Sequence, residues 1–211
     1  MKKGKLIIVS APSGCGKGTM LKEILKDDRY YYSVSSTTRE PREEDIDGVT
    51  YNFLTREQFE EKIKKDEWLE YAEYCNNYYG TPKAVTFSKL DEGKDVILEI
   101  EVEGAENVKK AYPEAVSIFI LPPSIQELER RLRKRGSEEE DVIEKRIERA
   151  KYEISQSDKY DYRVVNGELE FRKGSYFYEY VKTFNRTAYH KERKHLCPCY
   201  RYRKESKTDC R

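Results

Sequence analysis

The feature that most constrains this chain is a glycine-rich segment near its N-terminus, Ser13-Gly14-Cys15-Gly16-Lys17-Gly18-Thr19. It follows the apolar run 6–9 and precedes a pattern of apolar residues with helical spacing that starts at Met20. Gly14 and Gly16 lack a Cβ atom, so the backbone can turn sharply and direct successive N–H groups at an anion. The positive end of the following helix strengthens that field. The order strand, loop and helix therefore predicts a phosphate-binding loop.

Two side chains give this loop its chemistry. Lys17 supplies a mobile positive charge for the β- and γ-phosphates of a nucleotide, and the Thr19 hydroxyl can reach a magnesium ion. The general pattern has glycine and Ser or Thr where this chain has Ala11 and Gly18. Because the hydroxyl is shifted by one residue, we expect Thr19 to contact the metal through water. A plain glycine-rich turn is the alternative, but a turn needs neither the lysine nor the hydroxyl.

Composition limits the class of protein. Charged residues make up 38% of the 211 residues and hydrophobic residues 37%, which favours a soluble protein with one core. The longest apolar stretches have about five residues, whereas a membrane span needs roughly 20. Five cysteines, an odd number, do not indicate a disulfide framework, and Cys15 lies inside the phosphate-binding loop. We therefore expect a cytoplasmic protein with no membrane partner.

Apolar segments alternate with helical patterns along most of the chain. We predict strands at 6–10, 96–102, 116–121 and 162–165, and helices at 17–27, 104–111, 124–135 and 138–157. Such alternation is typical of an α/β fold, in which helices cover both faces of a parallel sheet. Ser124 is the predicted N-cap of its helix, with Glu127 at the capping-box position. Residues 33–90, with short β segments around a helix at 56–65, indicate a smaller, partly β lobe inserted into this fold.

A second group of anion-binding residue types lies in the inserted lobe. Residues 33–42 contain five hydroxyl side chains together with Arg39 and Arg42. Pro41 fixes the backbone between the arginines, so both guanidinium groups can grip one phosphate. Tyr51, Glu70 and the run 78–81 add further polar groups. Each has an ordinary structural explanation when taken alone, but next to a phosphate-binding loop they predict a second anion site.

Seven segments of the chain resemble guanylate kinases in order and spacing. They are Ser33–Arg42 (SVSSTTREPR), Asp47–Phe53, Trp68–Glu73, Asn77–Pro82, Gly93–Val96, Ile120–Ser124 and Arg130–Gly136. The similarity covers residues 4–169 and implies the phosphate-loop NTPase fold, with core residues 4–32 and 91–169. It also implies a GMP-binding lobe at 33–90 and a helical lid at about 136–150. The implied reaction converts ATP and GMP to ADP and GDP, with Mg²⁺ as the cofactor that accompanies ATP.

The resemblance also implies roles for individual residues. The GMP phosphate is expected on Arg39, Arg42, Tyr51 and Tyr79, and the guanine base on Ser35, Glu70 and Thr81. The catalytic residues are expected to be Lys17, Arg39, Arg135 and Arg146, with Arg131 close by. The family usually has Asp-x-Asp where this chain has Glu99-Ile100-Glu101. Glu101 is assigned to the GMP site, but its extra methylene leaves its exact contact open.

The expected chemistry agrees with these residue types. Guanine presents N1–H and N2–H₂ side by side, so one carboxylate such as Glu70 can accept both, whereas adenine presents an acceptor at N1. A buried polar group left unpaired can discriminate by roughly 10⁴–10⁵. A phosphate monoester has a second pKa of about 6, so the acceptor is already a dianion at neutral pH. The site therefore has to neutralise charge and needs no general base.

The C-terminal segment 170–211 departs from the family pattern. Residues 171–211 contain 12 Lys and Arg against 4 Asp and Glu, a net charge of +8, whereas the whole chain has +1. Apolar residues in 177–184 could form a helix that covers the sheet. The two histidines with Cys197 and Cys199 could be read as a zinc site, and the basic, aromatic composition as a nucleic-acid site. We favour a divergent terminus with neither partner.

Two other functions fit parts of the sequence. A non-catalytic guanylate-kinase-like module would bind a phosphopeptide in the lobe, but such modules usually lose the phosphate loop and the lid arginines, which are present here. A kinase for another small acceptor is opposed by Ser35, Glu70 and Thr81. The sequence patterns do not indicate an oligomeric state.

Overall fold

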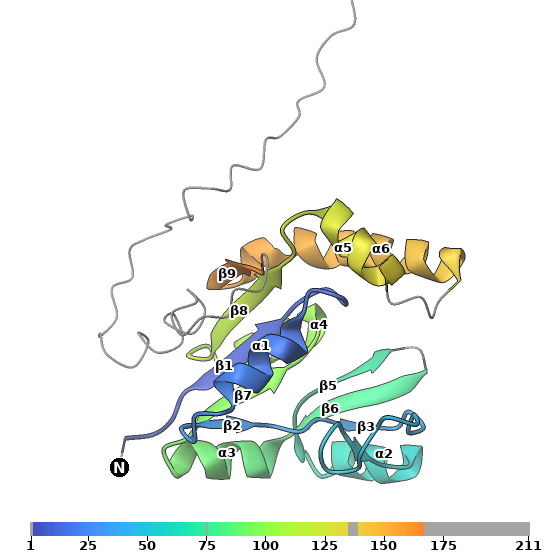
Figure 1. Cartoon of the computed structure of the whole chain (residues 1–211). Helices are drawn as coiled ribbons and strands as arrows, with labels where there is room; N and C mark the ends of the chain where they lie inside the picture. The colour runs from blue at the N-terminus through green and yellow to red at the C-terminus, as the bar shows by residue number, and fades with distance from the viewer. Residues whose placement is uncertain (1, 75, 135–138, 167–211) are drawn as a thin grey trace, which may run out of the picture. The chain divides into compact units, whose positions relative to one another are not determined.

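The computed structural model describes residues 2–74, 76–134 and 139–166, all of which belong to one compact unit. The predicted C-terminal segment 170–211 lies outside the described residues. The unit is built on a five-stranded sheet with the order β2-β7-β1-β8-β9 (Figure 1). Every neighbouring pair in this sheet is parallel. Its strands are β1 (Leu6–Ser10), β2 (Tyr30–Tyr32), β7 (Asp95–Glu99), β8 (Val116–Leu121) and β9 (Tyr162–Val165).

The central strand β1 is buried along its whole length, because helices cover both faces of the sheet. Its register places Ile8 beside Leu98 of β7 and Ser117 of β8. Alternate residues point to opposite faces, so Leu6 and Ile8 pack with apolar residues of two helices on one face. Figure 1 shows α1 in front of the sheet and α4 behind it. This confirms the predicted α/β architecture.

The core helices are α1 (Lys17–Ile24), α3 (Lys83–Asp91), α4 (Val102–Ala111), α5 (Ile125–Lys134) and α6 (Glu140–Ser155), followed by the short 3₁₀ helix η1 (Ser157–Lys159). Four of the core helices follow the predicted pattern with shifts of up to three residues, and one, α3, was not predicted. The Glu127 backbone N–H donates to Ser124 Oγ at 3.1 Å, which confirms Ser124 as the cap of α5. The Glu127 side chain pairs with Arg130 and Arg131.

The inserted lobe contains a four-stranded mixed sheet with the order β4-β3-β6-β5. Its elements are β3 (Ser36–Thr37), β4 (Asn52–Phe53), α2 (Arg56–Lys64), β5 (Trp68–Tyr74) and β6 (Asn77–Pro82). Phe59 of α2 is fully buried, and its ring stacks on Trp68 at 4.2 Å and on Tyr78 at 5.1 Å between centroids. Thr55 and Gln58 form a reciprocal capping box, so α2 begins where the sequence predicts.

None of the helices in the described part of the chain combines the length and the apolar character that a bilayer crossing requires.

Candidate active site

The phosphate-binding loop connects β1 to α1 and depends on two glycines with positive φ. Gly14 has φ +91° and Gly16 has φ +78°, a region that residues with a Cβ atom rarely adopt. A Cβ atom on Gly16 would also lie 2.6 Å from Nδ2 of Asn166. Between the glycines, Cys15 is buried, and burial raises the pKa of its thiol to about 12. The thiol is therefore neutral at physiological pH.

Asn166 is a part of this loop's support that the sequence analysis missed. Its Nδ2 donates to the carbonyl oxygen of Cys15 at 2.6 Å, and its backbone N–H donates to the Leu121 carbonyl at 2.8 Å. The side chain is buried directly after β9. A polar residue at the carboxyl end of a predicted parallel strand was the available signal, since ligands bind at that edge of such sheets.

Lys17 faces a carboxylate at the carboxyl end of β7. Its Nζ atom lies 3.3 Å from Oε1 of Glu99, and the Tyr32 hydroxyl donates to Oε2 of the same carboxylate at 3.1 Å. Burial and the Glu99 charge raise the pKa of the Tyr32 phenol far above its ordinary value. Glu99, which stands where the family usually has the shorter aspartate, therefore reaches the loop lysine. Thr19 and Gly18 are exposed in the first turn of α1.

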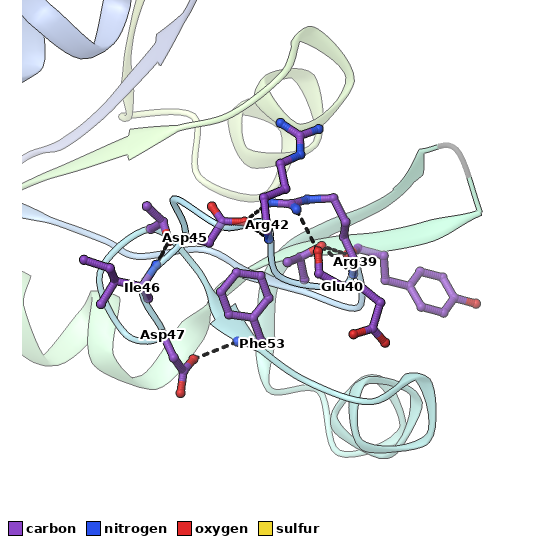
Figure 2. Close-up of polar contacts among 10 residues, drawn as sticks. Arg39, Glu40, Arg42, Asp45, Ile46, Asp47 and Phe53 are labelled. Carbon is purple, nitrogen blue, oxygen red and sulfur yellow. Dashed lines mark hydrogen bonds and ion pairs between the residues drawn. The ribbon is translucent and has the colours of Figure 1, made fainter.

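Three of the four predicted phosphate ligands of the lobe, Arg39, Tyr51 and Tyr79, form one cluster. The Arg39 guanidinium lies 5.6 Å from the ring of Tyr51, which makes an edge contact with Tyr79 at 6.0 Å between centroids. Arg42 is exposed, and Figure 2 shows its side chain extending away from Asp45. Asp45, which the sequence analysis did not single out, pairs with Arg39 at 2.7 Å.

Glu70 and Thr81 form a buried pair on adjacent strands β5 and β6. Thr81 Oγ1 donates to Oε1 of Glu70 at 2.7 Å. Burial raises the pKa of Glu70 to about 7, although the hydrogen bonds from Thr81 act in the opposite direction. Gly104 of α4 lets the helix pack closely against the Glu70 carboxylate, since a Cβ atom at this position would lie 2.8 Å from Glu70 Oε2. Ser35 is half-buried next to β3, and its carbonyl accepts from the Asn52 N–H at 2.9 Å.

On the lid side, Arg146 of α6 donates to the Ser13 hydroxyl, so one predicted catalytic arginine reaches the phosphate-binding loop. Arg131 of α5 instead donates to Glu127 at 2.7 Å. Arg135 and the first residues of the predicted lid lie outside the described residues.

Glu101 is held by an arginine that the sequence analysis missed. It is the exposed N-cap residue of α4, and its Oε2 accepts from Arg149 Nη2 at 3.1 Å. Arg149 also pairs with Glu103 and Glu153. In the sequence, Arg149 is a basic residue one helical turn after Arg146, and this spacing was the local indication that it could lie near the site.

Charges near the lobe cluster also affect Tyr51. Burial raises the pKa of Tyr51, and the charges of Tyr79 and Glu99 raise it further. Glu99 is the carboxylate that pairs with Lys17. The described residues therefore provide two groups of anion-binding side chains, one in the phosphate-binding loop and one in the lobe.

Comparisons with known proteins agree with this geometry. The guanylate kinase family pattern matches residues 3–173. Guanylate kinase from Carboxydothermus hydrogenoformans is 55% identical over 171 residues, which cover 81% of this chain and 84% of the relative. Guanylate kinase from Clostridium tetani is 52% identical over 169 residues, covering 80% and 81% of the two chains.

A solved structure is also similar along most of the chain. The crystal structure of guanylate kinase from Anaplasma phagocytophilum aligns with a TM-score of 0.69 and 31% sequence identity. The alignment covers 87% of this chain and 85% of that one. The fold is therefore the phosphate-loop NTPase fold, and the chain belongs to the guanylate kinase family.

Proposed function

We infer that the protein is a guanylate kinase, which transfers the γ-phosphoryl group of ATP to GMP and forms ADP and GDP. The observation that carries this inference is the combination of a phosphate-binding loop with a second anion cluster and a buried Glu70–Thr81 pair in the inserted lobe. Lys17 of the loop lies 3.3 Å from Glu99, Arg39 of the lobe lies 2.7 Å from Asp45, and Thr81 donates to Glu70 at 2.7 Å. One site for a nucleotide phosphate and one for a phosphorylated guanine nucleotide suit transfer between two phosphates.

The donor site is proposed to hold ATP with its Mg²⁺. Backbone N–H groups of the loop and the N-terminus of α1 bind the phosphates, and Lys17 contacts the β- and γ-phosphates. Thr19 is exposed in the first turn of α1, which suits a contact to Mg²⁺ directly or through water. The phosphate-binding residues are Ser13, Gly14, Cys15, Gly16, Lys17, Gly18 and Thr19.

The acceptor site is proposed to hold GMP in the inserted lobe. Arg39, Arg42, Tyr51 and Tyr79 bind its phosphate through charge-assisted and phenol hydrogen bonds. The ionised Glu70 accepts N1–H and N2–H₂ of guanine, and Thr81, which already donates to Glu70, keeps the carboxylate in orientation. We assign Ser35 to the base. Glu101 is also assigned to the GMP site, although in this structure its carboxylate pairs with Arg149.

Catalysis is proposed to consist of positioning and charge neutralisation. An oxygen of the GMP phosphate attacks the γ-phosphorus of ATP, and the bond between that phosphorus and the β,γ-bridging oxygen breaks, which releases ADP. Lys17, Arg39 and Arg146 neutralise the developing charge, together with Arg135 from the lid. Closure of the lid excludes water, so the phosphoryl group is not lost to hydrolysis.

No observation favours the non-catalytic phosphopeptide-binding alternative, since the loop retains Lys17 and Arg146 of the predicted lid donates to Ser13 of the loop. We also propose that the enzyme works in the cytoplasm with ATP and GMP as its partners. The unpaired Cys15 thiol inside the loop supports a reducing compartment.

The test is a coupled assay of ADP release by the purified full chain with GMP, AMP, CMP or UMP as acceptor. We expect rapid turnover with GMP and only background turnover with the other three. Lys17→Ala prepared in parallel measures contaminating kinases. Turnover with another nucleotide at a rate equal to GMP, or no GMP-dependent turnover, would overturn the proposal.

A further inference from the structure

A carboxylate in the lobe binds both arginines of the predicted phosphate site. Asp45 Oδ2 accepts from Arg39 Nη2 at 2.7 Å and from the Arg42 backbone N–H at 2.8 Å (Figure 2). Only 8% of the Asp45 side chain and 16% of the Arg39 side chain are exposed. One oxygen atom therefore fixes the direction of the first arginine and the backbone of the second.

The position of Asp45 is determined by its own loop. The Ile46 N–H donates to Thr50 Oγ1 at 2.8 Å, and the Gly48 N–H donates to the Tyr51 carbonyl at 2.8 Å. Gly48 adopts φ +73°, which favours glycine at this turn. Because these contacts close the loop on itself, the Asp45 carboxylate has a fixed place for reasons other than its pairing with Arg39.

The contacts with Asp45 and Glu40 use only part of the Arg39 guanidinium. A guanidinium has five N–H donors. One Nη2 donor goes to Asp45 and one Nη1 donor to the Glu40 carbonyl at 2.7 Å. The rings of Tyr51 and Phe53, at 5.6 and 5.8 Å from the guanidinium carbon, restrict its plane. The remaining donors are held in one orientation before a ligand arrives.

We propose that Asp45 is a positioning residue that orients Arg39 and Arg42 for the phosphate of GMP. This inference rests on the proposed function. An arginine side chain that is already ordered loses less conformational entropy on binding, so the phosphate is bound more tightly. The negative charge of Asp45 opposes this gain. That charge is balanced in part by hydrogen bonds from the Arg42 N–H and the Arg39 guanidinium, both of which lower the pKa of Asp45. We therefore expect the gain from orientation to exceed the repulsion.

The test compares GMP with guanosine, which has the same base and sugar but no phosphate. In Asp45→Asn of the full chain, we expect the Kd for GMP to rise about tenfold and that for guanosine to stay within about twofold. The KM for GMP rises in parallel and kcat falls, because Arg39 also stabilises the transferring group, whereas the KM for ATP changes little. Glu44→Gln is the matched control, because it removes the same charge from an exposed neighbour, and both affinities stay near wild type.

A second variant, Asp45→Glu, keeps the test informative if Asp45→Asn fails to fold. Asp45→Glu keeps the charge but displaces the carboxylate by one methylene, and we expect a smaller loss that is again specific to GMP. Equal weakening of GMP and guanosine would show a merely structural role, and tighter GMP binding in Asp45→Asn would show that Asp45 competes with the phosphate. Either result overturns the assignment of Asp45 alone. A wild-type protein that binds GMP no better than guanosine would instead overturn the proposed function.

Discussion

Thr81 Oγ1 donates a 2.7 Å hydrogen bond to Oε1 of Glu70, and both side chains are buried between the lobe strands and α4. The hydroxyl takes one oxygen of the carboxylate, while the lack of a Cβ atom on Gly104 leaves room beside the other. A buried carboxylate with one polar partner is costly unless a ligand supplies further donors. Guanine supplies two donors on one edge, which is why Glu70 is central to the proposed specificity.

Glu70→Gln is expected to lower kcat/KM for GMP by about 100-fold, or about 3 kcal/mol, with little change in the KM for ATP. The amide keeps the shape of the side chain but turns an NH₂ group toward the donors of guanine. Steady-state kinetics with varied GMP measure the effect. Glu73→Gln on the exposed side of the same strand is the control. A loss of less than about twofold in the Glu70 variant would show that Glu70 does not read the base.

Glu70 also predicts a pH dependence of stability. Its pKa of about 7 lies above the ordinary value of 4.5, so between these values the folded protein binds more protons than the unfolded chain. The contribution of Glu70 to the free energy of unfolding is therefore fully present below pH 4.5 and is lost as the pH rises through about 7. The full loss is about 3 kcal/mol.

Denaturant unfolding of the wild type and of Glu70→Gln at pH 5 and pH 8 measures this contribution. We expect the variant to gain stability relative to the wild type as the pH rises, since glutamine does not titrate. Other titrating groups are present in both proteins and cancel in the difference. A difference that does not change with pH would mean that Glu70 has an ordinary pKa.

Lys17→Ala is expected to reduce turnover by at least about 10³-fold while leaving the Kd for GMP within about threefold. Lys17 belongs to the donor loop and pairs with Glu99 at the end of β7, not with a residue of the lobe. Single-turnover transfer and GMP binding by calorimetry measure the two quantities separately. Near-normal turnover would contradict the proposed use of the loop lysine.

Asn166→Ala is expected to raise the KM for ATP several-fold and to lower the free energy of unfolding by about 1–3 kcal/mol, because the buried Cys15 carbonyl loses its donor. The KM for GMP should stay close to wild type, since the hydrogen bonds of Asn166 join the donor loop and β8 rather than the lobe. Kinetics with each substrate varied in turn distinguish the two effects. If both KM values rise equally, Asn166 has a general structural role.

The predictable parts of the fold are those in which local pattern and tertiary environment agree. β1, β8 and β9 have the predicted bounds because each is a short run rich in β-branched, aliphatic or aromatic residues. β2 was not predicted, since Tyr30–Tyr32 becomes a strand only by pairing with β7. β7 ends at Glu99 rather than at residue 102, because Val102 begins α4. α3 was missed, because it buries only Thr86 and Leu90 and has little apolar periodicity.

The site shows the same division. Residues within the phosphate-binding loop and the 33–42 segment could be identified from local spacing. The contacts of Lys17 with Glu99 and of Asn166 with Cys15 join positions far apart in the chain. Such pairs depend on strand order, which spacing alone does not specify. The pairing of Arg39 with Asp45 is local, but a loop of several carboxylates does not reveal which one turns toward the arginine.

The central claim is direct transfer between two phosphates, and the fate of the γ-phosphorus tests it most directly. The full chain is incubated with Mg²⁺, GMP and ATP labelled at the γ-phosphate, and the products are separated. We predict that the label appears in GDP in amounts equal to the ADP formed, and that Lys17→Ala forms almost no labelled GDP. Label found mainly as inorganic phosphate, or ADP formation that does not depend on GMP, would contradict the account.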